Sequence, residues 1–211
     1  MGAVRCGPVG RKVPRSPHVG GSRNRGSYMM MMDERVVFGN TFHGLFQIAL
    51  HGRLSLAARA ALGHMGLHLD RQPLPFYPAS VWRPSLEIVV RDLFPDLQHE
   101  EAYRRLGQKM VTDVSETVLG RGMLALGRAL GPRRLLMRMN HNFRNADNYV
   151  QMQLKELAPT TYEVHINETL GMHSYYQGII EAALGAAGAR EPHVHPARAE
   201  GGGCTYRVQW H

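Results

Sequence analysis

The sequence has few cysteines: of its 211 residues only Cys6 and Cys204 are cysteine, and they lie far apart. This spacing provides neither a CxxC metal pair nor a disulfide framework, so we expect a reducing compartment, the cytoplasm. The sequence also lacks an uninterrupted run of about 18 apolar residues, which excludes a membrane-spanning helix. What is present is a chain long enough to bury a substantial core without metal or disulfide cross-links.

Acidic residues are absent from residues 1–32, whereas six of the 25 basic residues lie there. From Asp33 on, basic residues nearly balance the 17 acidic ones, so nucleic acid is not an expected partner. Residues 1–32 are rich in Gly, Pro, Ser and Arg and have no apolar period. They are a disordered basic tail or an upstream translation artefact, with the natural start among Met29 to Met32; their composition also matches an organelle transit peptide. We expect a single domain over residues 33–211.

The first two thirds of this domain show the 3.6-residue apolar period of helices. Helical segments are predicted at 40–50, 54–66, 80–96, 96–120 and 121–140. Three prolines in 69–78 predict a loop there. Gly131 and Pro132 interrupt the last helical segment, and a second short helix can begin with that proline.

Several residues mark where these helices should begin. Asn40 or Thr41 is expected to be the N-cap of the first helix, and Asp96 that of the fourth. Pro84 is expected in the first turn of the third helix, because proline is tolerated where no N–H group is needed.

From Asn148 the apolar period changes to two, which is typical of strands with one buried face. Segments 149–157 and 162–167 are separated by a short turn and predict a hairpin. The helical pattern returns over 173–189, and 191–210 predicts a strand, a glycine loop and a final strand. The order predicts an α+β fold: an N-terminal helical half followed by β-β-α-β-β, with four strands in one antiparallel sheet.

Five segments carry a resemblance to a known family: GLHLDRQPLPFYPASVW, AYRRLGQKM, LGPRRLLMRMNHNFRNADNY, HINE and GIIEAALGAAGA. In wording and order they resemble a paralogous family of about this size, abundant in myxobacteria and known only as a domain of unknown function. The resemblance covers Asp33 to Trp210 and implies no activity.

The order of helices and strands is also similar, more distantly, to a superfamily of haem nitric-oxide sensors, four-vinyl-reductase-type sensor domains and Golgi tethering subunits. This resemblance implies either a small-molecule site between helices and sheet or a dimeric scaffold, and the fold does not choose between them. The haem sensors carry a Tyr-x-Ser-x-Arg porphyrin clamp, a spacing that is absent here, although His99 and His141 could nominally offer an axial ligand. We therefore expect no cofactor.

No segment has the spacing of a known catalytic or metal site. His64 and His68 lie four residues apart, as a helical ligand pair would, but Gly66 lies between them and no third ligand is indicated. The serines lack a Gly-x-Ser-x-Gly elbow, and Cys204 is expected to be an apolar thiol on a strand face. We expect no metal site and no enzymatic activity.

Polar residues gather just before the first strand and just after the second, and a hairpin brings these two ends together. They include Arg144, Asn148, Asn167 and Glu168. One interpretation is structural: Arg144 pairs with Glu168, and the asparagines satisfy backbone groups of turns. The other is a polar rim around a ligand pocket, with an aromatic wall formed by Trp82, Tyr149, Tyr175 and Tyr176.

A basic cluster also lies in the last helical segment of the N-terminal half. Its members are Arg133, Arg134, Arg138 and Arg144. Such a cluster is either a solvated helix face or a surface for an acidic partner or phosphate.

Three functional hypotheses follow. The leading one is a non-enzymatic sensor or regulatory domain that binds a small hydrophobic ligand or a protein partner, acting as a homodimer. The second is a dimeric interaction scaffold without a ligand. The third is an enzyme of unrecognised type, for which Arg144, Glu168 and His165 are the candidate residues.

Overall fold

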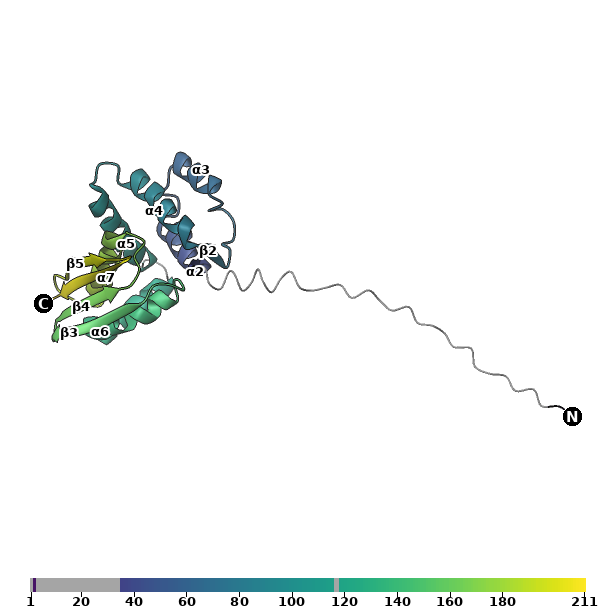
Figure 1. The fold of residues 1–211 in the computed structure, drawn as a ribbon. Coiled ribbons are helices and arrows are strands. Elements are labelled where there is room, and N and C mark those ends of the chain that lie inside the picture. The colour runs from purple at the N-terminus through teal and green to yellow at the C-terminus, as the bar shows by residue number, and fades with distance from the viewer. Residues whose placement is uncertain (1, 3–34, 116–117) are drawn as a thin grey trace. The chain divides into compact units, whose positions relative to one another are not determined.

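Alternating apolar residues build a four-stranded sheet in the C-terminal part of the chain, as predicted. Its strands are β3 (Met152–Ala158), β4 (Thr161–Ile166), β5 (His193–Glu200) and β6 (Gly203–Gln209). All neighbouring pairs are antiparallel, in the order β3-β4-β6-β5. Val164 of β4 lies opposite Tyr206 of β6, and both side chains are fully buried. The α+β class is therefore confirmed, with the helical half preceding the sheet (Figure 1).

The structure is a computed structural model that describes Gly2, residues 35–115 and residues 118–211. The predicted tail, residues 1–32, therefore lies outside the described residues except for Gly2. The helices of the described residues are α2 (Gly39–Phe42), the π-helix η1 (His43–Ala49), α3 (Leu56–His64), α4 (Ala79–Leu93), α5 (His99–Ser115), α6 (Val118–Arg144) and α7 (His173–Ala186). None of these described helices has the length and apolar character needed to cross a membrane.

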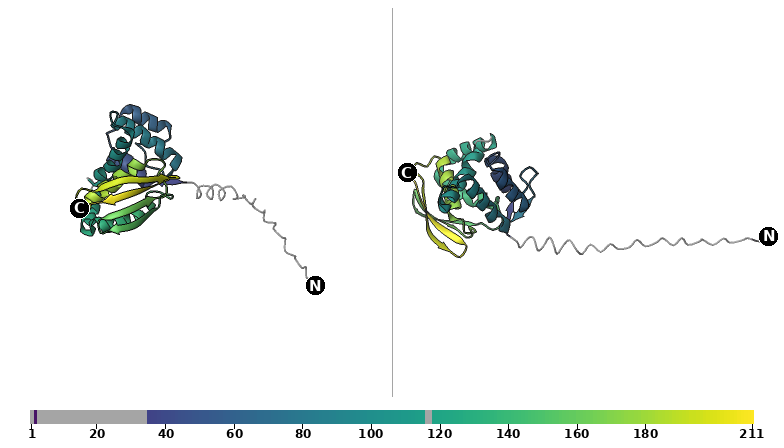
Figure 2. Two further views of the ribbon diagram at one scale, coloured as in Figure 1. Left: turned by 60° about the vertical axis from the view of Figure 1, so that its left-hand side comes forward. Right: turned by 90° about the horizontal axis from the view of Figure 1, so that it is seen from above.

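One hydrophobic core joins the helices to the sheet. It runs from Phe42 and Trp82 in the helical half to Tyr206 and Trp210 at the sheet. Figure 2 (right) shows the sheet, α7, α5 and the N-terminal helices following one another in that order. The helix α7 therefore lies between the sheet and the helical half, where residues of both can meet.

Two short strands were not predicted. β1 (Val36–Phe38) and β2 (Phe76–Pro78) pair antiparallel, with Val37 opposite Tyr77. Each has three residues, which is too short for a period of two to be recognised, and β2 ends the segment predicted as a loop. The predicted break in the last helix is confirmed, because Gly131 has a φ of 77° inside α6.

The predicted N-caps of the first helix are wrong. The helix begins at Gly39, whose N–H donates to the carbonyl oxygen of Pro75 at 2.8 Å. The side chains of Asn40 and Thr41 instead donate to the carbonyl oxygens of Asn145 and Ala146, both at 2.9 Å. A contact between distant segments has replaced local capping.

Two further helix starts differ from prediction. α5 begins at His99, three residues after Asp96, so Asp96 does not cap it. Pro84 lies inside α4 and not in its first turn, because that helix already begins at Ala79. Pro84 and Ser80 are both exposed, so the turn that lacks a hydrogen bond from the proline nitrogen lies at the protein surface.

Candidate functional site

The connection between α6 and β3 is held against the N-terminal strand β1. Val37 forms an antiparallel bridge with Asp147. The N–H of Phe38 donates to the carbonyl oxygen of Ala146 at 2.9 Å, and the N–H of Asn148 donates to that of Val36 at 3.2 Å. These bonds place Asp147 where the helical half meets the sheet.

Asp147 is a buried carboxylate at this junction, with 6% of its surface exposed. Its Oδ1 atom accepts hydrogen bonds from the N–H groups of Tyr149 (3.1 Å) and Val150 (2.7 Å). Among the described residues, none donates a hydrogen bond to Oδ2 or forms an ion pair with Asp147. Burial raises the pKa of this carboxyl from 3.8 to about 6, although the two backbone bonds oppose the rise.

Three tyrosines lie close enough to Asp147 for its negative charge to affect their pKa values. Burial raises the pKa of Tyr149, Tyr175 and Tyr176, and the charge of Asp147 raises each further. The rings of Tyr175 and Tyr176 meet edge to face at 5.7 Å, and Phe143 lies 5.8 Å from Tyr176. We call Asp147, Tyr149, Tyr175 and Tyr176 the Asp147 site.

The structure therefore brings together three of the four predicted aromatic wall residues. Tyr149 comes from the α6–β3 connection, and Tyr175 and Tyr176 come from α7. Trp82, the fourth, lies in α4, and its ring packs edge-on against Phe46 at 6.1 Å. No ring contact joins Trp82 to the three tyrosines within the described part of the chain.

The predicted rim asparagines satisfy backbone groups. Asn148 Oδ1 accepts from the N–H of Val36 at 2.8 Å. Asn167 Oδ1 accepts from the N–H of Gln151 at 2.6 Å, while its Nδ2 donates to the carbonyl oxygen of Tyr149 at 3.0 Å. These hydrogen bonds connect β1 to the α6–β3 connection, and the two ends of the β3–β4 hairpin to each other, beside Asp147.

The predicted pairing of Arg144 with Glu168 is wrong. Glu168 Oε2 pairs with Arg35 at 2.6 Å, and its Oε1 accepts from the N–H of Leu170 at 2.8 Å. Arg144 is the last residue of α6 and is exposed. Sequence patterns could not identify Arg35, because it lies 133 residues from Glu168 along the chain.

Asp147 is the functional candidate that the sequence analysis missed. The available signal was modest: Asp147 is the only acidic residue in HNFRNADNY, between the rim candidates Arg144 and Asn148. An aspartate in such a run is ordinarily a turn residue, and both side-chain hydrogen bonds of Asp147 are of that kind. Its burial among tyrosines depends on the tertiary structure.

A second feature is a surface hollow of about 690 Å³ beside the π-helix. Its lining includes His43, Gln47, Asp70 and Arg71. Gln47 Nε2 donates to the carbonyl oxygens of Leu69 (2.9 Å) and Arg71 (2.7 Å), so this amide is used in holding the loop. The hollow is open and has no buried titratable group, and we regard it as secondary to the Asp147 site.

Two further groups considered in the sequence analysis, Cys204 and His165, lie on strands of the sheet. Burial raises the pKa of the Cys204 thiol, which disfavours the nucleophilic thiolate. His165 Nδ1 lies 3.1 Å from Thr205 Oγ1, on neighbouring strands. The Asp147 site combines a hydrogen-bond acceptor with aromatic surface.

Comparison with known proteins identifies a family and a fold. The sequence model of a family described as a protein of unknown function, DUF2378, matches residues 35–211. No curated protein matches the sequence.

Solved structures of H-NOX domains have a similar fold. One, described as an oxygen-binding H-NOX domain related to soluble guanylate cyclases, is 17% identical, with a TM-score of 0.61 over 82% of this chain and 94% of that one. A structure from a study of H-NOX activation is 17% identical, with a TM-score of 0.62 over 82% and 96%. An unliganded Fe(II) H-NOX mutant from K. algicida is 11% identical, with a TM-score of 0.58 over the same shares. The predicted architectural resemblance to haem nitric-oxide sensors is confirmed at the level of fold.

Proposed function

This chain belongs to the DUF2378 family of proteins of unknown function, and we propose that it is a non-enzymatic sensor or regulatory domain that binds a small, largely apolar ligand at the Asp147 site. The observation that carries the proposal is the largely buried Asp147, 6% exposed, in which only Oδ1 accepts hydrogen bonds from the described residues and no cation pairs with the carboxylate. A buried carboxylate without a cationic partner costs folding free energy, and such groups are concentrated at binding sites.

The chemistry of the site indicates what the ligand carries. An amine or hydroxyl group can donate to Asp147 Oδ2, and an apolar or aromatic body can pack against the rings of Tyr175 and Tyr176. Ionised Asp147 would favour an amine, because charge-assisted hydrogen bonds are the stronger kind.

The fold supports a sensor role by analogy. The similar structures are H-NOX domains, and some of them were determined in studies of haem distortion and haem redox potential. At 17% identity or less this similarity concerns the fold, so the ligand has to be argued from the residues of this chain.

The residues present do not fit haem. His99, a nominal axial ligand, has a side chain that is 62% exposed and lies 2.9 Å from Glu87. His141, the other, is exposed on α6. No histidine is buried within the described ranges 35–113, 121–122 and 124–211, and the sequence lacks the Tyr-x-Ser-x-Arg spacing. The Asp147 site therefore calls for a different ligand.

A second candidate function is an interaction scaffold that needs no ligand. The observation in its favour is the exposed side of α6, which carries basic residues, whereas the opposite side of the helix packs into the core. In both candidates we expect the cytoplasmic homodimer predicted from the sequence.

Native mass spectrometry of the full-length protein tests the ligand-binding proposal. We expect a mass excess that disappears on denaturation, or a ligand-dependent rise in Tm in a screen of apolar amines and alcohols. Asp147→Asn keeps the acceptor for the two backbone N–H groups and removes the charge, so we expect it to weaken amine binding at least tenfold.

Asp96→Asn is the matched control, because Asp96 is an exposed aspartate outside the Asp147 site and forms no ion pair with any described residue. It should bind like the wild-type protein. The proposal would be contradicted if the folded wild-type protein carried no extra mass and no screened compound raised its Tm. The interaction scaffold would then be the remaining candidate function. The same mass spectrum reports whether the protein is a dimer.

A further inference from the structure

The second half of α6, after Gly131, is amphipathic. Its inward residues Leu136, Met139 and Phe143 are buried in the core. Its outward residues are exposed and share one side of the helix, because each lies three or four positions from another member: Arg134, Met137, Arg138, His141 and Arg144. We call these five residues the α6 basic face.

The positive charge of this face is not compensated within the protein. Residues 118–144 contain no Asp or Glu. Arg134, Arg138 and Arg144 form no hydrogen bond or ion pair with any residue that the structure describes. Their neighbour Arg133 differs, because it pairs with Glu156 at 2.9 Å and donates to the Tyr162 hydroxyl at 3.0 Å.

Most other described ion-pairing arginines lie on different elements. Examples are Arg35 with Glu168, Arg104 with Glu181 and Arg207 with Glu163. The excess positive charge on this face therefore comes from the arginines of α6 itself. It does not reflect the net charge of the chain, which is nearly balanced from Asp33 on.

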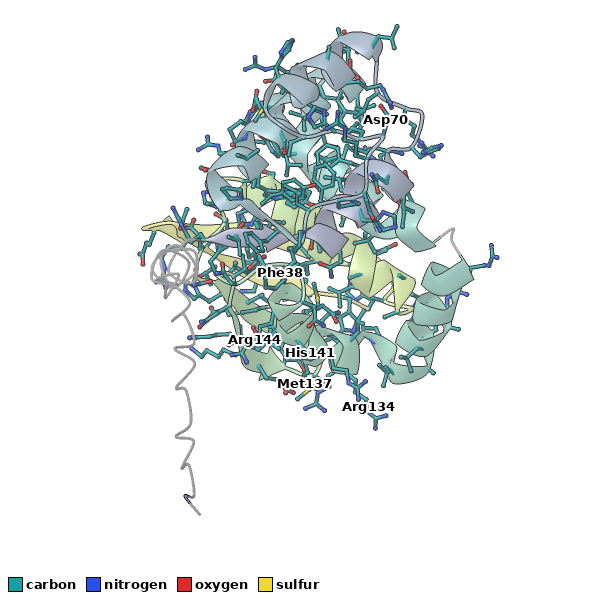
Figure 3. The ribbon with its side chains drawn as sticks, turned by 90° about the vertical axis from the view of Figure 1, so that its right-hand side faces the viewer. Phe38, Asp70, Arg134, Met137, His141 and Arg144 are labelled. Carbon is teal, nitrogen blue, oxygen red and sulfur yellow. The ribbon has the colours of Figure 1, made fainter. Side chains whose placement is uncertain are left out.

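An apolar side chain lies among these cations. Met137 is 60% exposed although it is large and apolar. Figure 3 shows Arg134, Met137, His141 and Arg144 one after another along α6 at the lower edge of the view. An exposed methionine flanked by arginines offers an adaptable apolar contact within a charged rim, the arrangement of a protein-binding surface.

We propose that the α6 basic face docks an acidic, amphipathic segment of a partner protein, with carboxylates against Arg134, Arg138 and Arg144 and an apolar side chain against Met137. A second copy of the same face is disfavoured, because arginines would meet arginines. A membrane would require several apolar residues on the outward side, but Met137 is the one apolar member of the α6 basic face. Nucleic acid would not need the exposed methionine.

The test uses the full chain and a synthetic helical peptide of about 15 residues, long enough to run beside Arg134–Arg144. The peptide has glutamates three and four residues apart and a central leucine. Binding is followed by fluorescence anisotropy at about 0.15 M salt, where weak long-range attraction is screened. We expect saturable binding that the charge-reversal variant R134E/R138E/R144E weakens about tenfold, since three exposed ion pairs each contribute a factor of about two.

Two further measurements make the test specific. A peptide with lysines in place of the glutamates should bind the reversed variant and not the wild-type protein, which requires direct charge pairing. Met137→Ala should weaken binding of the acidic peptide a few-fold without changing its salt dependence, because it removes apolar contact only.

The control variant R71E/R83E/R190E makes the same change in net charge with exposed arginines outside α6. It should bind the peptide like the wild-type protein. Equal loss in both triple variants, at unchanged Tm, would overturn the proposal. Tighter binding of phosphatidylserine vesicles or duplex DNA than of the peptide, lost in R134E/R138E/R144E, would also overturn it.

Discussion

At the scale of the residue, two buried carboxylates in this protein have opposite surroundings. Glu181 is 6% exposed and is satisfied on both oxygens: Arg104 (2.8 Å) and Gln108 (2.9 Å) donate to Oε2, and Gln177 (3.1 Å) donates to Oε1. Asp147 is equally buried, but only one of its oxygens has donors among the described residues. Glu181 therefore joins α5 to α7, whereas the side-chain hydrogen bonds of Asp147 are confined to its own turn.

The protonation of Asp147 should make stability depend on pH. Its pKa is about 6 in the folded protein against 3.8 ordinarily, so between these values the folded state binds more protons than the unfolded state. The free energy of unfolding should consequently rise as the pH falls from about 7 to about 4, by at most roughly 3 kcal/mol. Urea unfolding of the unliganded protein across this range measures the effect.

Asp147→Asn should abolish this dependence and be more stable than the wild-type protein at pH 7. Glu87 and Glu101 should not contribute to the change in stability above about pH 5. Their pKa values are lowered in the folded protein, so the stability that they contribute is lost only at more acidic pH. Asp96→Asn should leave the profile unchanged. A variant profile parallel to that of the wild-type protein would contradict the assignment.

At the scale of the element, the contact between α5 and α7 depends on two glycines. A Cβ atom at Gly178 of α7 would clash with the backbone carbonyl oxygen of Arg104, and one at Gly107 of α5 with that of Tyr175. The two helices thus pack backbone to backbone, and this close approach sets the position of Tyr175 and Tyr176.

Gly178→Ala should destabilise the protein by about 3 kcal/mol or more, because the clash is with backbone and the helices have to move apart. Gly185→Ala is the matched control in the same helix. Its Cβ would lie 4.0 Å from Pro192 Cγ, an ordinary contact, so we expect stabilisation of up to about 1 kcal/mol from helix propensity. Equal urea midpoints for the two variants would show that the crossing is not tight.

At the scale of the whole molecule, the helical half and the sheet share one core. Trp82 lies in α4, and Trp210 follows β6 and stacks on Tyr162 at 5.5 Å. Both tryptophans belong to the same continuous cluster of buried residues. Neither half can lose its packing without exposing the other, so the protein should unfold in one cooperative step.

The two tryptophans of the chain permit a direct test of this cooperativity. Trp210→Phe leaves Trp82 as the fluorescent reporter of the helical half, and Trp82→Phe leaves Trp210 as that of the sheet. In each variant the urea transition seen by fluorescence should coincide with that seen by far-ultraviolet circular dichroism. Separate transitions would mean that the halves are independent folding units.

The sequence by itself determined the elements that depend on periodicity. Apolar residues at a spacing of 3.6 or two decide which face of a long segment is buried, so the main helices, the β3–β4 hairpin and the α+β order followed from local pattern. The break at Gly131 followed as well, because backbone conformation there depends on the residue itself.

Only the tertiary structure decided which distant groups meet. It paired Glu168 with Arg35 and not with Arg144, formed the three-residue strands β1 and β2, and buried Asp147 beside Tyr149, Tyr175 and Tyr176. These contacts join segments far apart along the chain, and one chain's apolar pattern contains no information about such pairings. Local periodicity therefore determined the architecture, while the carboxylate at its centre became recognisable only once the chain was folded.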